Sequence, residues 1–290
     1  MNRKYLIQQI KEKQSYLCVG LDTNIEKIPP FLQSRPNAVF EFNKQIIDAT
    51  KDLCVAYKIN TAFYEANGVK GWKDLEKTLN YIPSTHFNIA DAKRGDIGNT
   101  SYQYAKAFFE TIPFDAITVA PYMGRDSIQP FLDYKGKWTI VLGLTSNAGA
   151  NNFELQQIMP GDITLLNKES VPSNSYQKFE GGYLYEKVIF DVSKWGNVDN
   201  LMFVVGATKA DEIASIRKII PNHFLLIPGV GFQGGSLAEV SKYGLNKDCG
   251  LLVNVSRAII YAGNKKNFAE EARSIALEYQ TEMKSYLRES

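Results

Sequence analysis

The sequence predicts an α/β protein built as a single (β/α)8 barrel, the TIM-barrel architecture. Eight short runs of β-branched and other apolar residues alternate with segments of helical periodicity, which is the pattern of repeated βαβ units. Eight parallel strands are the number that closes such a barrel. No linker, internal repeat or low-complexity tract divides the 290 residues, so we expect residues 1–290 to form one domain. An open, doubly wound sheet is the alternative arrangement of the same elements.

The predicted strands are short and apolar, as expected for parallel strands that are covered on both faces. They cover residues 16–22, 55–60, 87–91, 116–119, 139–144, 202–205, 224–228 and 251–255. Between them, apolar residues recur every three or four positions and form one stripe along each helix. Two such stripes are Val39, Phe42, Ile46, Ala49 and Leu53, and Phe268, Ala272, Ile275, Tyr279 and Met283.

Three features are added to this alternation. Residues 2–14 predict an extra helix before the first strand. Thr208 and Asp211 have the spacing of a capping box, which predicts the start of a helix that ends before Pro221. Residues 147–182, after the fifth strand, are polar and rich in turn-forming residues, and they predict a long loop. Loops of this length are usually functional or disordered.

Composition and charge exclude several classes of protein. With 44% hydrophobic and 22% charged residues, the chain has the make-up of a globular protein with a sizeable core. Its 33 basic and 31 acidic residues leave a net charge of +2, which argues against a nucleic-acid or membrane-surface partner. The longest nearly apolar run, residues 224–232, is too short to cross a bilayer. The first residues lack the apolar core of a signal peptide.

The cysteines and histidines predict no metal site. Cys18, Cys54 and Cys249 form no CxxC pair, and His86 and His223 add too few ligands for a zinc site. Both histidines precede predicted strands, so we expect them to be structural. This cysteine usage is typical of a reducing compartment, and we expect a cytoplasmic protein.

Charged residues gather where predicted strands end. Asp22 ends the first strand, Lys58 lies in the second, and Asp91, Lys93 and Asp96 follow one another from the end of the third. In a barrel these positions share one rim, where catalytic residues are found. Residues two apart in a strand face the same side, so Asp91 and Lys93 can pair. A lysine flanked by carboxylates stays an ammonium and can donate a proton to a developing carbanion. The alternative is a solvated network of ion pairs.

A second candidate site follows the last two strands. Residues 228–235 read PGVGFQGG, and Arg257 follows the eighth strand. Glycines let backbone amides approach an anion, and barrel enzymes often bind phosphate at these two loops. The stretch also matches the dinucleotide pattern GxGxxG, but no acidic residue lies at the expected distance after it. A purely structural glycine turn is the other alternative.

A third, weaker candidate is the group Thr145, Ser146 and Asn147, which ends the fifth strand. Its side chains can hydrogen-bond the edge of a planar amide or imide. Ser and Asn are also common turn-forming residues and need no such role.

Taken in order, these segments resemble one family, orotidine 5′-phosphate decarboxylase in its longer bacterial form (type 2 subfamily). The resemblance covers most of the chain. The motifs that carry it are CVGLDTN (18–24), AYKIN (56–60), DAKRGDIGNT (91–100), APYMGRDSIQPF (120–131), TSN (145–147), PGVGFQGG (228–235) and NVSRAI (254–259).

The resemblance implies decarboxylation of orotidine 5′-phosphate to uridine 5′-phosphate in de novo pyrimidine biosynthesis, without a cofactor. It implies that Lys93 protonates C6 of the pyrimidine as CO₂ leaves, while Asp91 lies against the departing carboxylate. It further implies that Asp22 and Lys58 hold ribose hydroxyls and the charged network.

The remaining roles also come from the resemblance. Ser146 is implied to bind the pyrimidine, and Gln233, Gly234 and Arg257 to bind the phosphate. A homodimer is implied, in which Asp96 and Thr100 belong to the site of the partner subunit.

Two other functions are open at this point. A metal-dependent sugar-phosphate lyase or decarboxylase can share the DxKxxD element, but its Mg²⁺ needs an acidic ligand where Lys58 stands; Glu65 is the acid that could replace it. A non-catalytic barrel that senses a nucleotide would keep the phosphate loops and would have no need for Lys93 between Asp91 and Asp96.

Overall fold

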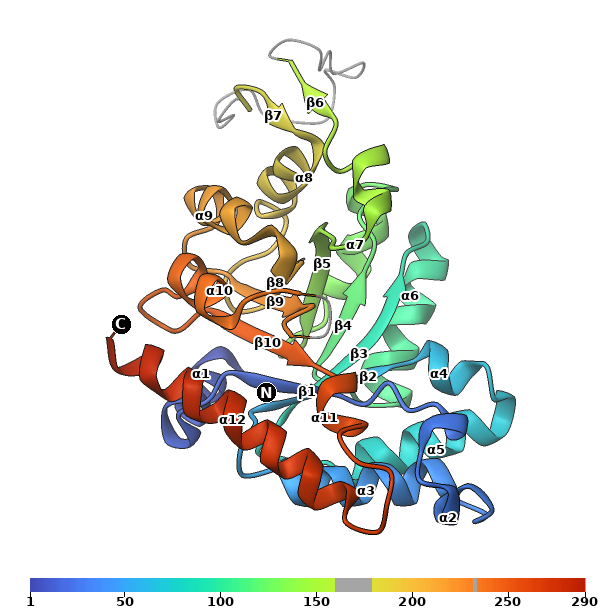
Figure 1. Ribbon diagram of the computed structural model, residues 1–290. Coiled ribbons are helices and arrows are strands. Elements are labelled where there is room, and N and C mark those ends of the chain that lie inside the picture. The colour runs from blue at the N-terminus through green and yellow to red at the C-terminus, as the bar shows by residue number, and fades with distance from the viewer. Residues whose placement is uncertain (160–178, 232–233, 290) are drawn as a thin grey trace.

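The computed structural model describes residues 1–159, 179–231 and 234–289. Eight parallel strands form a closed barrel in the order β1-β10-β9-β8-β5-β4-β3-β2 (Figure 1). They are β1 (Leu17–Gly20), β2 (Ala56–Asn60), β3 (Phe87–Arg94), β4 (Ala116–Val119), β5 (Trp138–Leu144), β8 (Leu201–Val205), β9 (Phe224–Pro228) and β10 (Leu251–Val255). The predicted barrel is confirmed, and the open sheet is wrong because β1 pairs with both β2 and β10.

The strands are apolar because the barrel buries them on both faces. Every residue of β1, β4, β8 and β10 is buried. In β1, Cys18 pairs with Asn254 of β10 on one side and with Ala56 of β2 on the other. The first strand therefore closes the sheet into a barrel. A continuous apolar run is what a strand without a solvent face requires.

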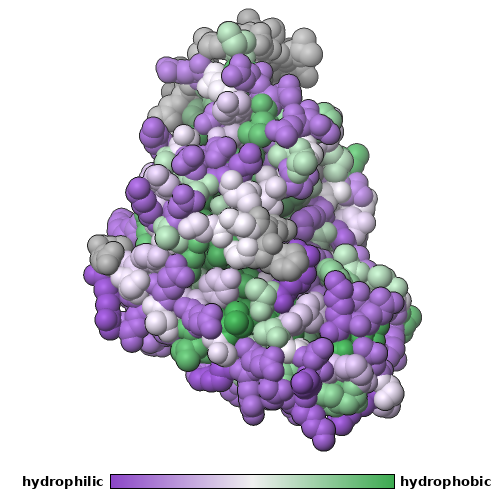
Figure 2. All heavy atoms as spheres, viewed as in Figure 1, coloured by the Kyte–Doolittle hydropathy of each residue, from purple (hydrophilic) through white to green (hydrophobic). Residues whose placement is uncertain are grey.

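The helices cover the outside of the barrel (Figure 1). The longer ones after successive barrel strands are α3 (Ala38–Thr50), α5 (Gly68–Tyr81), α6 (Gly98–Lys106), α7 (Arg125–Leu132), α8 (Leu184–Val192), α9 (Ala210–Ile219), α10 (Leu237–Gly244) and α12 (Phe268–Glu289). Shorter turns are η1 (Ile25–Lys27), α2 (Pro30–Gln33), α4 (Ala62–Glu65), η2 (Ala107–Thr111) and α11 (Arg257–Ile260). Figure 2 shows a mainly hydrophilic surface on this face, with hydrophobic residues in small scattered groups.

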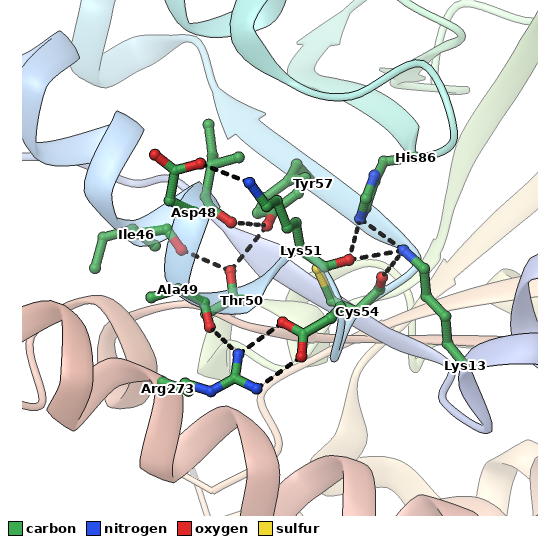
Figure 3. Close-up of polar contacts among 12 residues, drawn as sticks. Lys13, Ile46, Asp48, Ala49, Thr50, Lys51, Cys54, Tyr57, His86 and Arg273 are labelled. Carbon is green, nitrogen blue, oxygen red and sulfur yellow. Dashed lines mark hydrogen bonds and ion pairs between the residues drawn. The ribbon is translucent and has the colours of Figure 1, made fainter.

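Residues of the two predicted apolar stripes pack against each other where α3 meets α12. Phe42 of α3 stacks on Phe268 of α12 with ring centroids 5.1 Å apart. At the other end of this contact, Arg273 donates to both carboxylate oxygens of Asp52 at 2.6 and 2.7 Å and to the Ala49 carbonyl at 2.8 Å (Figure 3). The last helix is thereby fixed against the first covering helix of the barrel.

The extra helix before the barrel is confirmed as α1 (Arg3–Lys13). The Asn2 side chain accepts a hydrogen bond from the Tyr5 amide, as an N-cap residue does, and Gln14 ends the helix in the left-handed region at φ 50°. Among the helices that the structure describes, none is both long and apolar enough to cross a membrane.

The predicted capping box at Thr208 is wrong. Thr208 lies inside a 3-10 helix, η4 (Ala207–Lys209), and α9 begins at Ala210 with no side-chain cap. A capping residue needs extended backbone immediately before the helix. Here the chain already turns before α9, since the Lys209 amide bonds to the Gly206 carbonyl, so Thr208 is not at the capping position.

The segment after β5 contains more structure than the predicted loop. It includes a 3-10 helix, η3 (Ala148–Asn152), and two short antiparallel strands, β6 (Gln157–Ile158) and β7 (Gly182–Tyr183). Figure 1 shows this pair standing away from the barrel, next to α8. Residues 160–178 of the predicted loop lie outside the described residues.

A polar cluster at the amino ends of β2 and β3 joins α1 to the barrel (Figure 3). The Lys13 ammonium donates to the Lys51 and Cys54 carbonyls, each at 2.8 Å, and lies 2.8 Å from Nε2 of His86. Cations are favourable where the last carbonyls of a helix are free, as at the end of α3. His86 therefore lies in a contact at the end of the barrel that carries no predicted catalytic residue.

These contacts predict how stability changes with pH. Burial and the neighbouring Lys13 lower the pKa of His86 to about 4, and burial with Arg3 and Arg217 lowers the pKa of His223 to about 4. An unfolded histidine titrates near pH 6.5, so between these values the unfolded chain binds more protons. The free energy of unfolding should therefore fall between pH 7 and pH 4, by up to about 3 kcal/mol for each histidine.

Denaturant unfolding at several pH values measures this effect. The double variant His86→Gln/His223→Gln should lose most of the dependence between pH 4 and 6.5, and each single variant should lose part of it. An unchanged slope in the double variant would contradict the assignment.

Candidate active site

A pocket lies at the carboxyl ends of the barrel strands, and it unites most of the predicted catalytic residues. Five residues predicted from sequence line it together: Asp22, Lys58, Asp91, Lys93 and Arg257. The rest of the lining consists of Thr118, Val204, Leu226, Pro228, Gly229, Val230, Asn254, Val255, Ser256 and Ala258. The two sequence motifs, which lie far apart along the chain, thus contribute to one pocket.

Four charged side chains alternate along one side of the pocket. The Lys58 ammonium lies 2.8 Å from Oδ2 of Asp91 and 3.4 Å from Oδ1 of Asp22. The Lys93 ammonium lies 2.6 Å from Oδ1 of Asp91. The Lys58 side chain is only 4% exposed, whereas that of Lys93 is 51% exposed. Lys58 therefore acts as the buried counter-ion of the network, and Lys93 is the ammonium that a bound molecule can reach.

The environment keeps these groups charged. Burial alone would raise the pKa of Asp91, but the Lys58 and Lys93 ammoniums hold that pKa well below its ordinary value. Burial alone would lower the pKa of Lys58, but the Asp22 and Asp91 carboxylates raise it above its ordinary value. Opposite charges within a few ångströms favour the ionised form of both partners. At neutral pH the pocket therefore presents a fixed carboxylate beside a fixed ammonium.

The pairing of Asp91 with Lys93 is confirmed, but regular strand alternation does not produce it. The register between β3 and β4 shifts between Ala90 and Arg94, and Lys93 has a left-handed backbone with φ 47°. A non-glycine residue in that region is strained, and such residues gather at functional sites. The strand continues to Arg94, beyond the predicted end at Asp91, so the irregularity lies within the strand.

Sequence reasoning missed Thr118, which contacts both of these residues. Its hydroxyl donates to Oδ1 of Asp91 at 3.1 Å and accepts the Lys93 amide at 2.9 Å. Thr118 is 1% exposed. The available signal was a hydroxyl residue near the carboxyl end of an otherwise apolar strand, a position that threonine also fills for its β propensity.

The glycine loop after β9 forms a tight turn. Gly229, Gly231 and Gly234 have φ of 101°, 76° and 88°, which are conformations that favour glycine. The amides of Gly231, Gly234 and Gly235 all donate to carbonyls within the turn. These three amides are thus used by the turn itself, and the expected amide cradle is reduced to the pocket-lining Gly229 and Val230 beside Arg257.

Several predicted binding residues do not line this pocket. Gly234 lies in a separate hollow between the start of α9 and the start of α10. Ser146 packs closely against Gly206, where an added Cβ would come within 2.8 Å of the serine Cβ. Asp96 accepts the amide of Ile97 at 2.8 Å, and Thr100 is exposed in the first turn of α6. Gln233 lies outside the described residues.

The metal-dependent alternative finds little support in the described residues. Lys58 lies in β2 at the position where we expect that reaction to need an acid. Glu65, the acid that could replace it, forms an ion pair with Arg94. Within residues 1–159, 179–231 and 234–289, no group of three or more His, Cys, Asp or Glu side chains is arranged to hold a metal ion.

Comparison with known proteins supports the resemblance. The family model described as "Orotidine 5'-phosphate decarboxylase / HUMPS family" matches residues 15–272. A protein of Christiangramia forsetii named orotidine 5′-phosphate decarboxylase is 56% identical over 290 residues, covering 99% of each chain. A protein of the same name from Bacteroides fragilis is 52% identical over 291 residues, with 99% of each chain covered.

Solved structures agree with the fold and the family. The structure of Leishmania donovani OMP decarboxylase has a TM-score of 0.75 and 32% identity, covering 97% of this chain and 99% of that one. A putative orotidine-monophosphate decarboxylase from Toxoplasma gondii has a TM-score of 0.79 and 31% identity, covering 97% of both chains. Because the family match runs from before Asp22 to beyond Arg257 and so includes both sides of the pocket, this chain belongs to the orotidine 5′-phosphate decarboxylase / HUMPS family.

Proposed function

We propose that this chain decarboxylates orotidine 5′-phosphate to uridine 5′-phosphate in de novo pyrimidine biosynthesis, with Lys93 as the proton donor. The observation that carries the proposal is the Lys93 ammonium, held 2.6 Å from the Asp91 carboxylate at the mouth of the pocket. Family membership and the names of relatives that are 52 to 56% identical support the same reaction.

The reaction needs what this pair supplies. Loss of CO₂ breaks the bond between C6 and the carboxyl group and leaves the electron pair on an sp² carbon that has no electron sink. A preorganised ammonium stabilises that developing charge, and its proton then forms the new bond to C6. Asp91 is the group that would lie against the departing carboxylate. Lys93 becomes a neutral amine in this step and regains a proton from solvent, to which it is half exposed.

The other pocket residues are proposed to bind substrate. Asp22 and Lys58 would hold the ribose hydroxyls in addition to completing the charged network. Arg257 would bind the phosphate through charge-assisted hydrogen bonds, as guanidinium groups do. Arg257 lines the same pocket as Lys93, which fits this division of roles.

Three further residues complete the proposed binding site. We assign Ser146 to the pyrimidine, and Gln233 and Gly234 to the phosphate. Binding energy from the phosphate can be used to close the loops over the pocket and exclude water, which lowers the barrier at a distant carbon.

We further propose a homodimer in which Asp96 and Thr100 enter the site of the partner subunit. In its own chain neither residue lines the pocket. Large apolar side chains next to them in sequence are exposed: Ile97 by 58% and Tyr102 by 45%. Exposed apolar groups of this kind are common where a second protein surface binds.

We also propose that residues 1–290 are one catalytic domain and that the protein works in the cytoplasm. The cysteines support the location, because Cys18, Cys54 and Cys249 are all free and buried. Thiols without disulfides fit a reducing compartment.

Replacing the proton donor tests the central proposal. Lys93→Ala should abolish measurable turnover of orotidine 5′-phosphate, followed by loss of its ultraviolet absorbance, because no ammonium then faces C6. Binding of uridine 5′-phosphate should persist, since the phosphate side of the pocket is untouched. Lys70→Ala is a matched control, as Lys70 is 57% exposed and also paired with an aspartate. Full activity of Lys93→Ala would contradict the assignment.

Replacing the phosphate-binding residue should separate binding from chemistry. Arg257→Ala should raise KM by about 10- to 100-fold, the range expected for a charge-assisted hydrogen bond. Added phosphite dianion should partly restore turnover of a substrate that lacks phosphate. Equal losses with the phosphorylated and the truncated substrate would show that Arg257 has another role.

Mixing two inactive variants tests the shared site. Lys93→Ala and Asp96→Ala should each be inactive alone, but a hybrid dimer contains one site with Lys93 and with Asp96 of the partner subunit. After subunit exchange at equal amounts, activity should return to about one quarter of wild type per site, because half of the dimers are hybrids with one intact site each. No recovery in a mixture shown to contain hybrids would contradict sharing.

A further inference from the structure

We infer that Thr118 is a positioning residue for the reaction, because one buried hydroxyl fixes both the Asp91 carboxylate and the Lys93 backbone. This inference rests on the proposed role of Lys93 and extends it to β4. Thr118 belongs to neither of the two motifs from which the site was predicted, and it enters the pocket from a different strand.

The direction of each hydrogen bond follows from the chemistry of the partners. A backbone amide can only donate, so the Thr118 hydroxyl accepts from the Lys93 amide at 2.9 Å. An ionised carboxylate can only accept, so the hydroxyl gives its single proton to Oδ1 of Asp91 at 3.1 Å. Because Thr118 is 1% exposed, water does not compete freely for either bond. The hydroxyl is fully used by two residues of the proposed reaction.

The hydrogen bond from the Lys93 amide to the Thr118 hydroxyl forms where regular pairing between β3 and β4 is interrupted. Regular pairing of β3 with β4 joins Ala90 to Ile117 and resumes between Arg94 and Val119, with the register shift between them. Within that interval Lys93 has φ 47°, a conformation that an L-residue keeps only when its surroundings fix it. The Thr118 side chain supplies the acceptor for the Lys93 amide there, and it thereby holds the base of the lysine side chain.

The hydrogen bond from the Thr118 hydroxyl makes it one of three donors that hold the Asp91 carboxylate. Oδ2 of Asp91 contacts Lys58, and Oδ1 is shared by Lys93 and Thr118. These three donors come from β2, β3 and β4, so the plane of the carboxylate is fixed against three neighbouring strands. Without the hydroxyl, Oδ1 would keep only the half-exposed Lys93 as a donor among the described residues. We expect the angle between carboxylate and ammonium to loosen as a result.

Three variants test this role. Thr118→Val keeps the shape and loses the hydroxyl, and Thr118→Ser keeps the hydroxyl. Thr139→Val is the matched control in the neighbouring strand β5, because Thr139 is fully buried and its hydroxyl has no hydrogen-bond partner among the described residues. All are assayed for kcat and KM with orotidine 5′-phosphate and for binding of uridine 5′-phosphate.

Thr118→Val should lower kcat by about 10- to 100-fold, the range for loss of a buried hydrogen bond to a charged group. KM and nucleotide binding should change less than about twofold, because the lost contact does not touch the phosphate side. The acidic limb of the pH profile of kcat should move to higher pH, since the ionised form of Asp91 loses a donor. Thr118→Ser should retain most of kcat and the wild-type profile, and Thr139→Val should match wild type.

Two outcomes would overturn the inference: wild-type kcat and pH profile in Thr118→Val, or equal impairment of Thr118→Val and Thr118→Ser. If Thr118→Val does not fold, Thr118→Ala takes its place, and a kcat equal to that of Thr118→Ser overturns the inference. An inactive wild-type chain would instead refute the proposed function. An active wild type with an unaffected Thr118→Val refutes only the role of Thr118.

Discussion

The site depends on one buried ammonium. Lys58 is 4% exposed, and an unpaired charge at that depth would be strongly destabilising. It is tolerated because Asp22 and Asp91 reach it from the strands on either side. That geometry requires the ends of β1, β2 and β3 to stay in register, with Gly20 beside Lys58 and Asn60 beside Asp91. Losing either carboxylate would leave positive charge buried with half of its compensation, so this requirement for stability also fixes the groups to which we assign the chemistry.

The same network keeps Asp91 ionised. Burial alone would raise the pKa of this carboxyl, but the Lys58 and Lys93 ammoniums lower it. In the proposed reaction, a carboxylate that stays ionised next to an anionic substrate would raise the energy of the bound ground state, and loss of CO₂ would remove that repulsion. The neighbouring Lys93 keeps a left-handed backbone for which the register shift in β3 makes room. Strain of this kind persists only where the surroundings fix it. Here the Thr118 hydroxyl accepts a hydrogen bond from the Lys93 amide.

The sequence predicted the barrel well because burial on both faces leaves a strong pattern in every strand, and eight such runs close a ring. It predicted the Asp91 and Lys93 contact for an incomplete reason, since alternation alone does not include the register shift. Thr118 was missed because threonine is ordinary in a strand, and its importance comes from a register irregularity between two strands. The start of α9 was wrong because a preceding 3-10 turn displaced Thr208 from the capping position. For Lys93, Thr118 and Thr208, the sequence did not reveal how an adjacent strand or turn runs in space.

Closure of the barrel explains how the proposed phosphate-binding residues and the charged network can act together. Asp22 and Arg257 lie far apart in sequence, but β1 and β10 are paired, and the seam between them is so tight that a Cβ on Gly20 would come within 1.8 Å of the Ser256 hydroxyl. Just beyond α11, the Tyr261 hydroxyl donates to the Asp22 carbonyl at 3.1 Å and accepts the Asn24 amide at 2.8 Å. The segment that carries Arg257 is thus bonded to the segment that carries Asp22. Energy gained by binding a phosphate at one side can therefore restrain the charged network at the other, which is how a remote group contributes to catalysis.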